Sequence, residues 1–129
     1  MNLLLDTHIF LWFINASERL PDSFREQIQS SENDVYLSVV SFWEIVIKNQ
    51  LGKLPLPKSP KEFIPQQRQL HQIKSLNLDE SAVAQLGNLP QHHRDPFDRM
   101  IICQSIASEM TIVTVDKVVL QYEIKALSK

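Results

Sequence analysis

Short apolar runs alternate along the chain with segments of helical periodicity, and this alternation predicts βαβ units. Buried strands are expected at residues 3–5, 35–37 and 111–115, with two further candidates at 73–76 and 123–127. Helices are expected where apolar residues recur every three to four positions between capping residues and Gly or Pro stops. These helices cover residues 8–15, 21–30, 41–50, 60–70, 79–87 and 95–108. The expected fold class is therefore α/β.

Length and composition are those of one globular domain over residues 1–129, with 43% hydrophobic residues. No secretory leader is expected, because Met1 is followed directly by a strand, and the apolar stretch 9–14 is too short to span a bilayer. A cytoplasmic protein without a membrane segment is the expectation. Cys103 is the single cysteine, so an internal disulfide and a multi-cysteine zinc site are excluded.

The net charge of −2 and the pI near 6.1 do not match a protein that coats nucleic acid nonspecifically. A compact acidic active site with local Lys and Arg residues would give the same overall charge. Charge alone therefore does not decide between a nuclease and a protein that does not act on nucleic acid.

Four carboxylates stand next to apolar segments, where acids are unusual. Asp6 and Asp116 follow expected strands, whereas Glu44 and Asp98 lie in the first turns of expected helices. A parallel sheet brings such positions together at its carboxyl edge, where ligands bind. Hard divalent cations prefer oxygen ligands, so this pattern predicts a divalent-metal site.

Each acid also has a structural interpretation. Ser41 and Glu44 have the spacing of a capping box, and Glu44 stands four residues before Lys48 in a favourable ion-pair register. Asp98 lies near the positive end of a helix for which Asp95 is the expected N-cap. Taken alone, Glu44 is better explained by these structural roles, and Asp98 remains open. Asp6 and Asp116 could each be a turn or N-cap residue, although both stand where α/β active sites form. Only the combination of the four acids favours a common site.

Other chemically capable residues are expected to have structural roles. His8, His92 and His93 could be metal ligands or general bases. His8 is instead expected to pack beside the turn after the first strand, and His92 and His93 to lie in a solvated polar loop. Trp12 and Trp43 lie on expected helices, which favours core packing over the stacking of nucleic-acid bases.

Four segments together resemble PIN-domain proteins of the VapC type, and the resemblance extends from about residue 2 to residue 126. The segments are Leu4-Leu5-Asp6-Thr7-His8, Ser41-Phe42-Trp43-Glu44-Ile45-x-x-Lys48, His93-Arg94-Asp95-Pro96-Phe97-Asp98-Arg99 and Val113-Thr114-Val115-Asp116. The resemblance implies a PIN-like α/β/α sandwich around a central parallel sheet of about five strands. It also implies a Mg²⁺- or Mn²⁺-dependent endoribonuclease that is the toxin of a toxin–antitoxin pair.

The same resemblance implies the residues of the site and the partners. The four acidic positions of the family fall on Asp6, Glu44, Asp98 and Asp116, as metal ligands and catalytic residues. Neighbouring polar positions, expected to support the ligands or contact phosphate, are Thr7, Ser41, Arg99 and Thr114. The implied partners are an RNA substrate, a cognate antitoxin protein and a second copy of the chain in a homodimer.

Two alternative functions remain open. A phosphate-transfer domain of the receiver or haloacid-phosphatase type also places Asp after its first strand, but it needs a second acid nearby, and here Thr7 and His8 follow Asp6. A catalytically inactive PIN-fold binding module is the other alternative, although the intact acids count against it.

Overall fold

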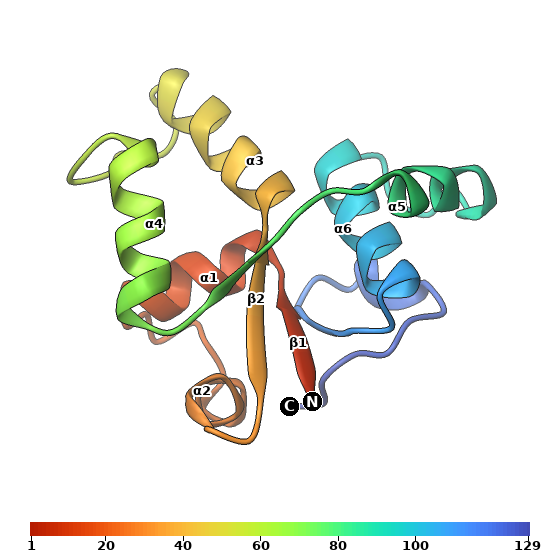
Figure 1. The fold of residues 1–129 in the computed structure, drawn as a ribbon, viewed down its shortest axis with the longest axis horizontal. Coiled ribbons are helices and arrows are strands. Elements are labelled where there is room, and N and C mark those ends of the chain that lie inside the picture. Colours follow the sequence, from red (N-terminus) through yellow and green to blue (C-terminus); the bar gives the residue numbers. More distant parts are fainter.

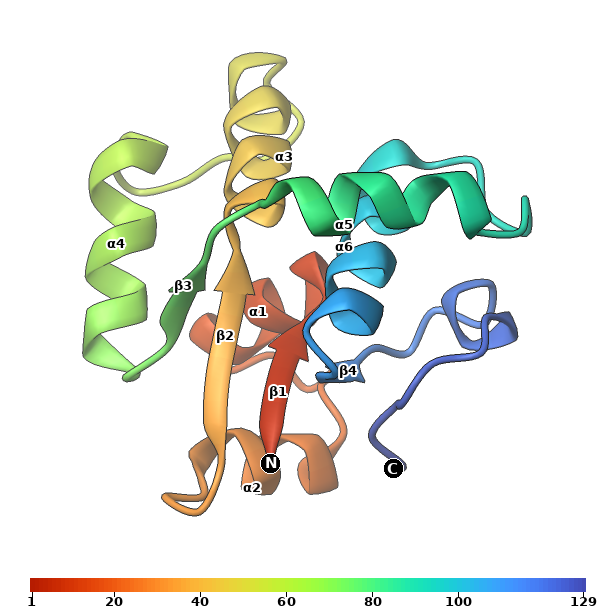
Figure 2. The ribbon, with the colours of Figure 1, turned by 45° about the vertical axis from the view of Figure 1, so that its right-hand side comes forward.

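The structure, a computed structural model, describes all residues from 1 to 129. Four parallel strands form one sheet in the order β3-β2-β1-β4 (Figure 2). The strands are β1 (Asn2–Leu5), β2 (Asp34–Ser38), β3 (Lys74–Leu76) and β4 (Thr111–Val113). The segment expected as a fifth strand contacts β4 only through an isolated parallel bridge between Ile112 and Ala126. The sheet therefore has four strands, where about five were expected.

Helices cover both faces of this sheet, as parallel strands require. They are α1 (Thr7–Ile14), α2 (Asp22–Gln29), α3 (Val39–Gln50), α4 (Pro60–Leu70), α5 (Glu80–Gln85) and α6 (Pro96–Ala107), with 3₁₀ turns at Leu86–Asn88 and Val119–Gln121. In Figure 1, α1, α2 and α4 lie on one side of β1 and β2, and α5 and α6 lie on the other. No helix has both the length and the apolar character needed to cross a membrane.

Strand β1 contributes to two separate hydrophobic clusters because its side chains alternate between the faces of the sheet. Leu3 and Leu5 are fully buried with Phe10 of α1 and Phe24 of α2. Leu4 is fully buried in a second cluster that includes Ile102 of α6. The predicted α/β/α sandwich is confirmed.

The order of the strands locates the place where a ligand would bind. Strand β1 lies between β2 and β4, so the chain proceeds from β1 toward one side of the sheet and later returns to the other. Open parallel sheets bind ligands beyond the carboxyl ends of their strands at such a switch point. Asp6 directly follows β1, and Asp116 lies three residues beyond the end of β4.

Two predicted boundaries are wrong in ways that affect the site. Helix α3 begins at Val39 instead of Ser41, because the side-chain oxygen of Ser38 accepts the backbone N–H of Val40 and caps the helix there. Strand β4 ends at Val113, after which the hydroxyl of Thr114 accepts a backbone N–H two residues later. The earlier start of α3 places Ser41 inside the helix, where its hydroxyl lies 2.9 Å from that of Thr7. The earlier end of β4 leaves Thr114 outside the strand, where its hydroxyl donates to Asp6.

Candidate active site

Asp6 lies at the carboxyl end of β1, and hydrogen bonds fix both of its carboxylate oxygens. Oδ1 accepts the backbone N–H of Thr7 at 2.7 Å, which caps α1, and Oδ2 accepts the hydroxyl of Thr114 at 2.7 Å. The residue is only 7% exposed. Burial raises the pKa of Asp6, and the charge of Glu44 adds to this, although the hydrogen bond from Thr114 and the nearby His8 act in the opposite direction. The carboxylate is thus well oriented but disfavoured as an anion.

Glu44, on the first half of α3, is buried and contacts two hydrogen-bond donors. The Thr7 hydroxyl donates to Oε1 at 2.8 Å, and Lys48 Nζ lies 2.7 Å from Oε2. The hydroxyls of Thr7 and Ser41 lie 2.9 Å apart. The predicted ion pair with Lys48 is confirmed, whereas the capping box is wrong because Ser41 lies inside the helix and faces Thr7. Glu44 is therefore linked to the end of β1 through Thr7.

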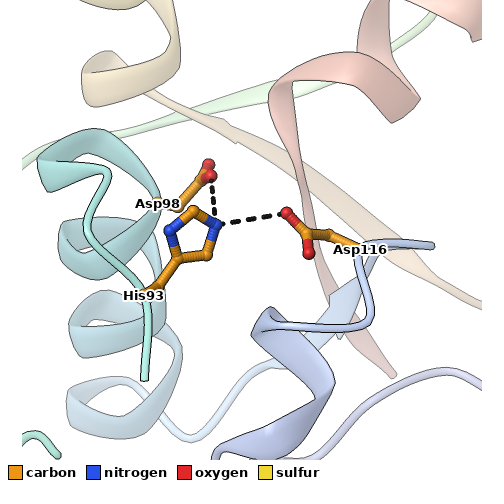
Figure 3. Close-up of side chains that lie close together, drawn as sticks. All are labelled: His93, Asp98 and Asp116. Atoms are coloured by element: carbon orange, nitrogen blue, oxygen red, sulfur yellow. Dashed lines mark hydrogen bonds and ion pairs between the residues drawn. The ribbon is translucent and has the colours of Figure 1, made fainter. Parts of the chain in front are cut away.

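Asp98 and Asp116 meet at the side chain of His93 (Figure 3). His93 Nε2 lies 3.1 Å from Asp98 Oδ2 and 3.2 Å from Asp116 Oδ2. The three ligand atoms all lie within 4.8 Å of one another, a spacing that can hold a metal ion. Asp98 comes from the first turn of α6, Asp116 from the turn after β4, and His93 from the loop before α6. Asp6 and Glu44 lie outside this three-residue group.

The negative charges of the other carboxylates nevertheless affect the pKa of Asp98, so the acids lie close enough to interact. Burial, together with the charges of Asp6, Asp95 and Glu44, raises the pKa of Asp98 to about 7, and His93 opposes the shift. Burial also raises the pKa of Asp116, but hydrogen bonds from the Val118 N–H and from His93 outweigh it, and the net shift is downward. The acids therefore form one negatively charged region, in which the protonated form of Asp98 is favoured.

His93 is the site residue that sequence reasoning missed. It was expected in a solvated loop, yet its side chain is only 17% exposed. Its backbone N–H donates to the Tyr122 hydroxyl at 2.8 Å, and its Nδ1 accepts the backbone N–H of Asp95 at 3.1 Å. Asp95 caps α6 as predicted, because its Oδ1 accepts the N–H groups of Phe97 and Asp98. His93 lies in a polar loop without periodicity, so no local pattern of the sequence identifies it as a site residue.

The four polar residues expected around the acids divide into two groups. Thr7 and Thr114 hydrogen-bond directly to carboxylates of the site, and Ser41 adjoins Thr7. Arg99 does not contact an acid of the site. Its Nη1 donates to the Pro90 carbonyl at 2.9 Å and lies 3.2 Å from the Tyr122 hydroxyl, so Arg99 organises the loop that carries His93.

An apolar cavity of about 420 Å³ lies between α3 and α6. Trp43 and Phe97, which precede Glu44 and Asp98 in the sequence, line it together with Met100. The Trp43 ring packs edge-on against Phe97, with centroids 5.0 Å apart, but the residue is 58% exposed. The expectation that Trp43 packs in the core is wrong, because Phe97 of α6 covers only part of its ring.

Comparison with known proteins assigns the chain to a family. The family model described as "PIN domain" matches residues 3–125. This chain belongs to the PIN domain family. The match includes both strands that lead into the site, β1 and β4, and all four predicted acids.

Individual relatives of this PIN domain agree with the assignment. Ribonuclease VapC16 of Mycobacterium tuberculosis is 33% identical over 60 residues, which is 46% of this chain and 43% of that protein. The match thus spans less than half the length of this relative.

Solved structures share the fold over nearly the full chain. VapBC2 of Rickettsia felis, bound to a promoter DNA fragment, has a TM-score of 0.72 and 18% identity and covers 98% of each chain. VapBC-1 of nontypeable Haemophilus influenzae has a TM-score of 0.69 and 15% identity, over 99% of this chain and 98% of that chain. At these identities the structures establish the fold alone.

Proposed function

We propose that this PIN domain is a divalent-cation-dependent endoribonuclease and the toxin of a toxin–antitoxin pair. One observation carries the proposal: Asp6, Glu44, Asp98 and Asp116 lie at the carboxyl edge of the sheet, where burial and neighbouring acids raise the pKa of Asp98 to about 7. Excess negative charge of this kind is what a bound cation neutralises. The ribonuclease name of the Mycobacterium tuberculosis relative supports RNA as the substrate.

The residues of the site fit Mg²⁺ or Mn²⁺. The four carboxylates supply oxygen ligands, and Cys103 is buried away from them in a hydrophobic cluster. Mg²⁺ typically uses one or two carboxylates directly and keeps several waters, so four acids are sufficient for one or two ions. When bound, such a cation supplies an activated water and neutralises charge on the phosphate.

The protein's own contribution is to hold the acids in position before the substrate binds. Thr114 and the backbone N–H of Thr7 fix the two oxygens of Asp6, and the Thr7 hydroxyl fixes one oxygen of Glu44. Lys48 lies beside Glu44 with a side chain that is 39% exposed, which leaves its charge available to a phosphate group. These groups are therefore already oriented and do not need to reorganise during the reaction.

The nucleophile is a water molecule, because the side-chain hydroxyls of the site are already engaged. Thr7 and Thr114 donate to carboxylates, and Ser41 is paired with Thr7. Attack by water leaves a 5′-phosphate and a 3′-hydroxyl without involving the 2′-hydroxyl of the RNA. Single-stranded loops are the expected targets, because their backbone can enter a cleft and their bases can be splayed out.

RNA cleavage assays test this proposal. Purified protein is incubated with total RNA in Mg²⁺, in Mn²⁺ and in excess EDTA, and the ends of the products are mapped. Asp98→Asn should abolish cleavage, whereas Asp34→Asn, which changes an exposed acid at the amino end of β2, should cleave like wild type. Undiminished cleavage in EDTA or by the Asp98→Asn variant would refute the assignment.

A protein antitoxin is the proposed partner, and we propose the cytoplasm as the place where the two proteins act. The VapBC names of the structural neighbours support this, as does the apolar cavity lined by Trp43, Phe97 and Met100. An antitoxin segment that fills this cavity with an apolar side chain could direct an Arg or Lys toward the acids and exclude the substrate. We also propose that the chain forms a homodimer, as the family resemblance implies.

Co-expression with the small protein encoded beside this gene tests the partner. The two proteins should co-purify, and the partner should suppress the toxicity of this chain. Trp43→Ala should weaken the complex, since exposed aromatic anchors carry much of the binding energy in interfaces. Leu51→Ala is the matched control, because Leu51 is 63% exposed just beyond the other end of α3. A stable complex in which both variants bind like wild type would exclude this cavity as the docking site.

The two alternative functions have less support. Membership of the PIN family does not favour a receiver or phosphatase domain. An inactive PIN module would not need four acids at the carboxyl edge, and the cleavage assay distinguishes it directly.

A further inference from the structure

We infer that His93 is a positioning residue that competes with the cation, because its Nε2–H lies between Asp98 and Asp116 where a divalent cation would bind. This inference rests on the proposed function, since it concerns the metal site of the proposed nuclease. His93 Nε2 lies 3.1 Å and 3.2 Å from the Oδ2 atoms of the two acids (Figure 3). One N–H group thus bridges two carboxylates that come from different segments of the chain.

The hydrogen bonds of the imidazole ring determine which nitrogen carries the proton. Nδ1 accepts the backbone N–H of Asp95 at 3.1 Å, so Nδ1 holds a lone pair. A neutral imidazole has one protonated nitrogen, and here that nitrogen must be Nε2. Nε2 therefore donates to Asp98 and Asp116 and has no lone pair available for a metal ion.

A histidine that binds a metal ion has the opposite arrangement. Its free ring nitrogen usually donates an N–H to a carboxylate or a carbonyl, and this donor bond fixes the ligating tautomer. In this structure, the second nitrogen of His93 faces a donor, the N–H of Asp95. Ligation by Nε2 would move the proton to Nδ1, where it would oppose that N–H. The local backbone therefore disfavours His93 as a ligand.

Contacts with distant residues hold the His93 backbone in place. Its N–H donates to the Tyr122 hydroxyl at 2.8 Å, and Arg99 Nη1 also bonds to this hydroxyl. These bonds anchor the backbone of the loop, so the imidazole ring is held between Asp98 and Asp116 when no cation is bound. A cation that bridges Asp98 and Asp116 must displace the ring, and the lost hydrogen bonds reduce the affinity for the cation.

Two substitutions of His93 test the roles of its two ring nitrogens separately. His93→Asn keeps an acceptor near the place of Nδ1, for the N–H of Asp95, but has no donor at the place of Nε2. His93→Gln has an amide N–H that can reach the place of Nε2. Calorimetric titration with MgCl₂ should show tighter binding to His93→Asn by roughly tenfold, or about 1.4 kcal/mol. The affinity of His93→Gln should remain close to that of wild type.

The ring nitrogens can also be observed directly by ¹⁵N NMR. In metal-free protein, Nε2 of His93 should be protonated and Nδ1 should be bare, and the Nε2 resonance should shift when MgCl₂ is added. Neither readout depends on RNA cleavage, so a failure of this inference can be distinguished from a failure of the proposed function.

Several results would overturn the inference. Weaker binding by His93→Asn, with a larger loss for MnCl₂ than for MgCl₂, would make His93 a ligand. Equal affinities of wild type, His93→Asn and His93→Gln for Mg²⁺, or a proton on Nδ1, would show that His93 does not compete with the cation. If neither wild type nor either variant binds a divalent cation, both the proposed function and the competition by His93 are refuted. The ¹⁵N resonances would still show whether Nε2 of His93 carries the proton.

Discussion

Replacement of Asp98 by Asn should stabilise the metal-free protein, and the gain should grow as the pH rises. The pKa of Asp98 in the folded protein is about 7, whereas the ordinary pKa of an Asp side chain is 3.8. Below pH 4 both states are protonated, and the cost of the buried charge is absent. Between pH 4 and pH 7 the folded state binds more protons than the unfolded chain, so its stability falls as the pH rises. Above pH 7 the cost is fully present.

The size of this effect follows from the shift in pKa. One pKa unit corresponds to about 1.4 kcal/mol, so a shift of about three units sets an upper limit of about 4 kcal/mol. The Asp98 side chain is 17% exposed, so water and relaxation of the site reduce this value. A remaining gain of about 2 kcal/mol would raise the melting temperature by roughly 6 to 10 °C for a chain of this size.

Urea denaturation in EDTA, followed by tryptophan fluorescence at several pH values between 4 and 8.5, measures this difference. The free energy of unfolding of Asp98→Asn minus that of wild type should be small at pH 4 and largest above pH 7. Saturating MgCl₂ should then stabilise wild type more than the variant, because only ions bound to the native state shift the equilibrium. A difference that does not change with pH would refute the raised pKa of Asp98.

Three further predictions concern other groups of the site. Asp116→Asn should lower the stability of metal-free protein at pH 7, opposite to the Asp98 variant, because hydrogen bonds from His93 and Val118 stabilise the ionised form; a higher melting temperature would contradict this. Thr114→Val should lose about 1 to 3 kcal/mol in urea denaturation, because it leaves the buried Asp6 without its hydroxyl donor, and Thr114→Ser should retain most of the stability. Ser38→Ala should cost about 1 kcal/mol, the usual value of an N-cap, and an unchanged urea midpoint would show that Ser38 does not stabilise α3.

Local sequence patterns were sufficient to locate the positions of three of the four acids. Asp6 and Asp116 could be placed because apolar runs mark the strands before them, and Asp98 because Asp95 and Pro96 mark the start of α6. Parallel strands and their helices then bring these positions to one edge of the sheet. No knowledge of distant contacts was needed.

Glu44 and His93 required information that local patterns do not contain. Glu44 was assigned to the start of a helix at Ser41, but α3 begins at Val39, and Glu44 faces the site because of its contact with Thr7. His93 lies in a polar loop without periodicity, and its position depends on a hydrogen bond to the hydroxyl of Tyr122, 29 residues away. Contacts of this kind depend on tertiary packing and cannot be read from spacing.

The single-bridge contact of the segment near residue 126 has a similar cause. The apolar residues of this segment predict a strand, but after the 3₁₀ turn at Val119–Gln121 the chain pairs with β4 only at Ile112. A run of apolar residues indicates burial, whereas a strand also requires a neighbouring backbone in register over several residues. The number of strands therefore depends on the path of the chain after the turn.

The central place of β1 also determines when the site can form during translation. Strand β1 is paired on one side with β4, and one carboxylate oxygen of Asp6 accepts the hydroxyl of Thr114, which follows 108 residues later. A nascent chain that ends before Thr114 lacks both Asp116 and the hydroxyl that donates to Asp6. About 70 residues separate Glu44 from Asp116, which corresponds to roughly 4 to 14 s of synthesis. Any nuclease activity of this site therefore begins only after most of the chain has been made, and a partner protein translated beforehand could already be folded at that time.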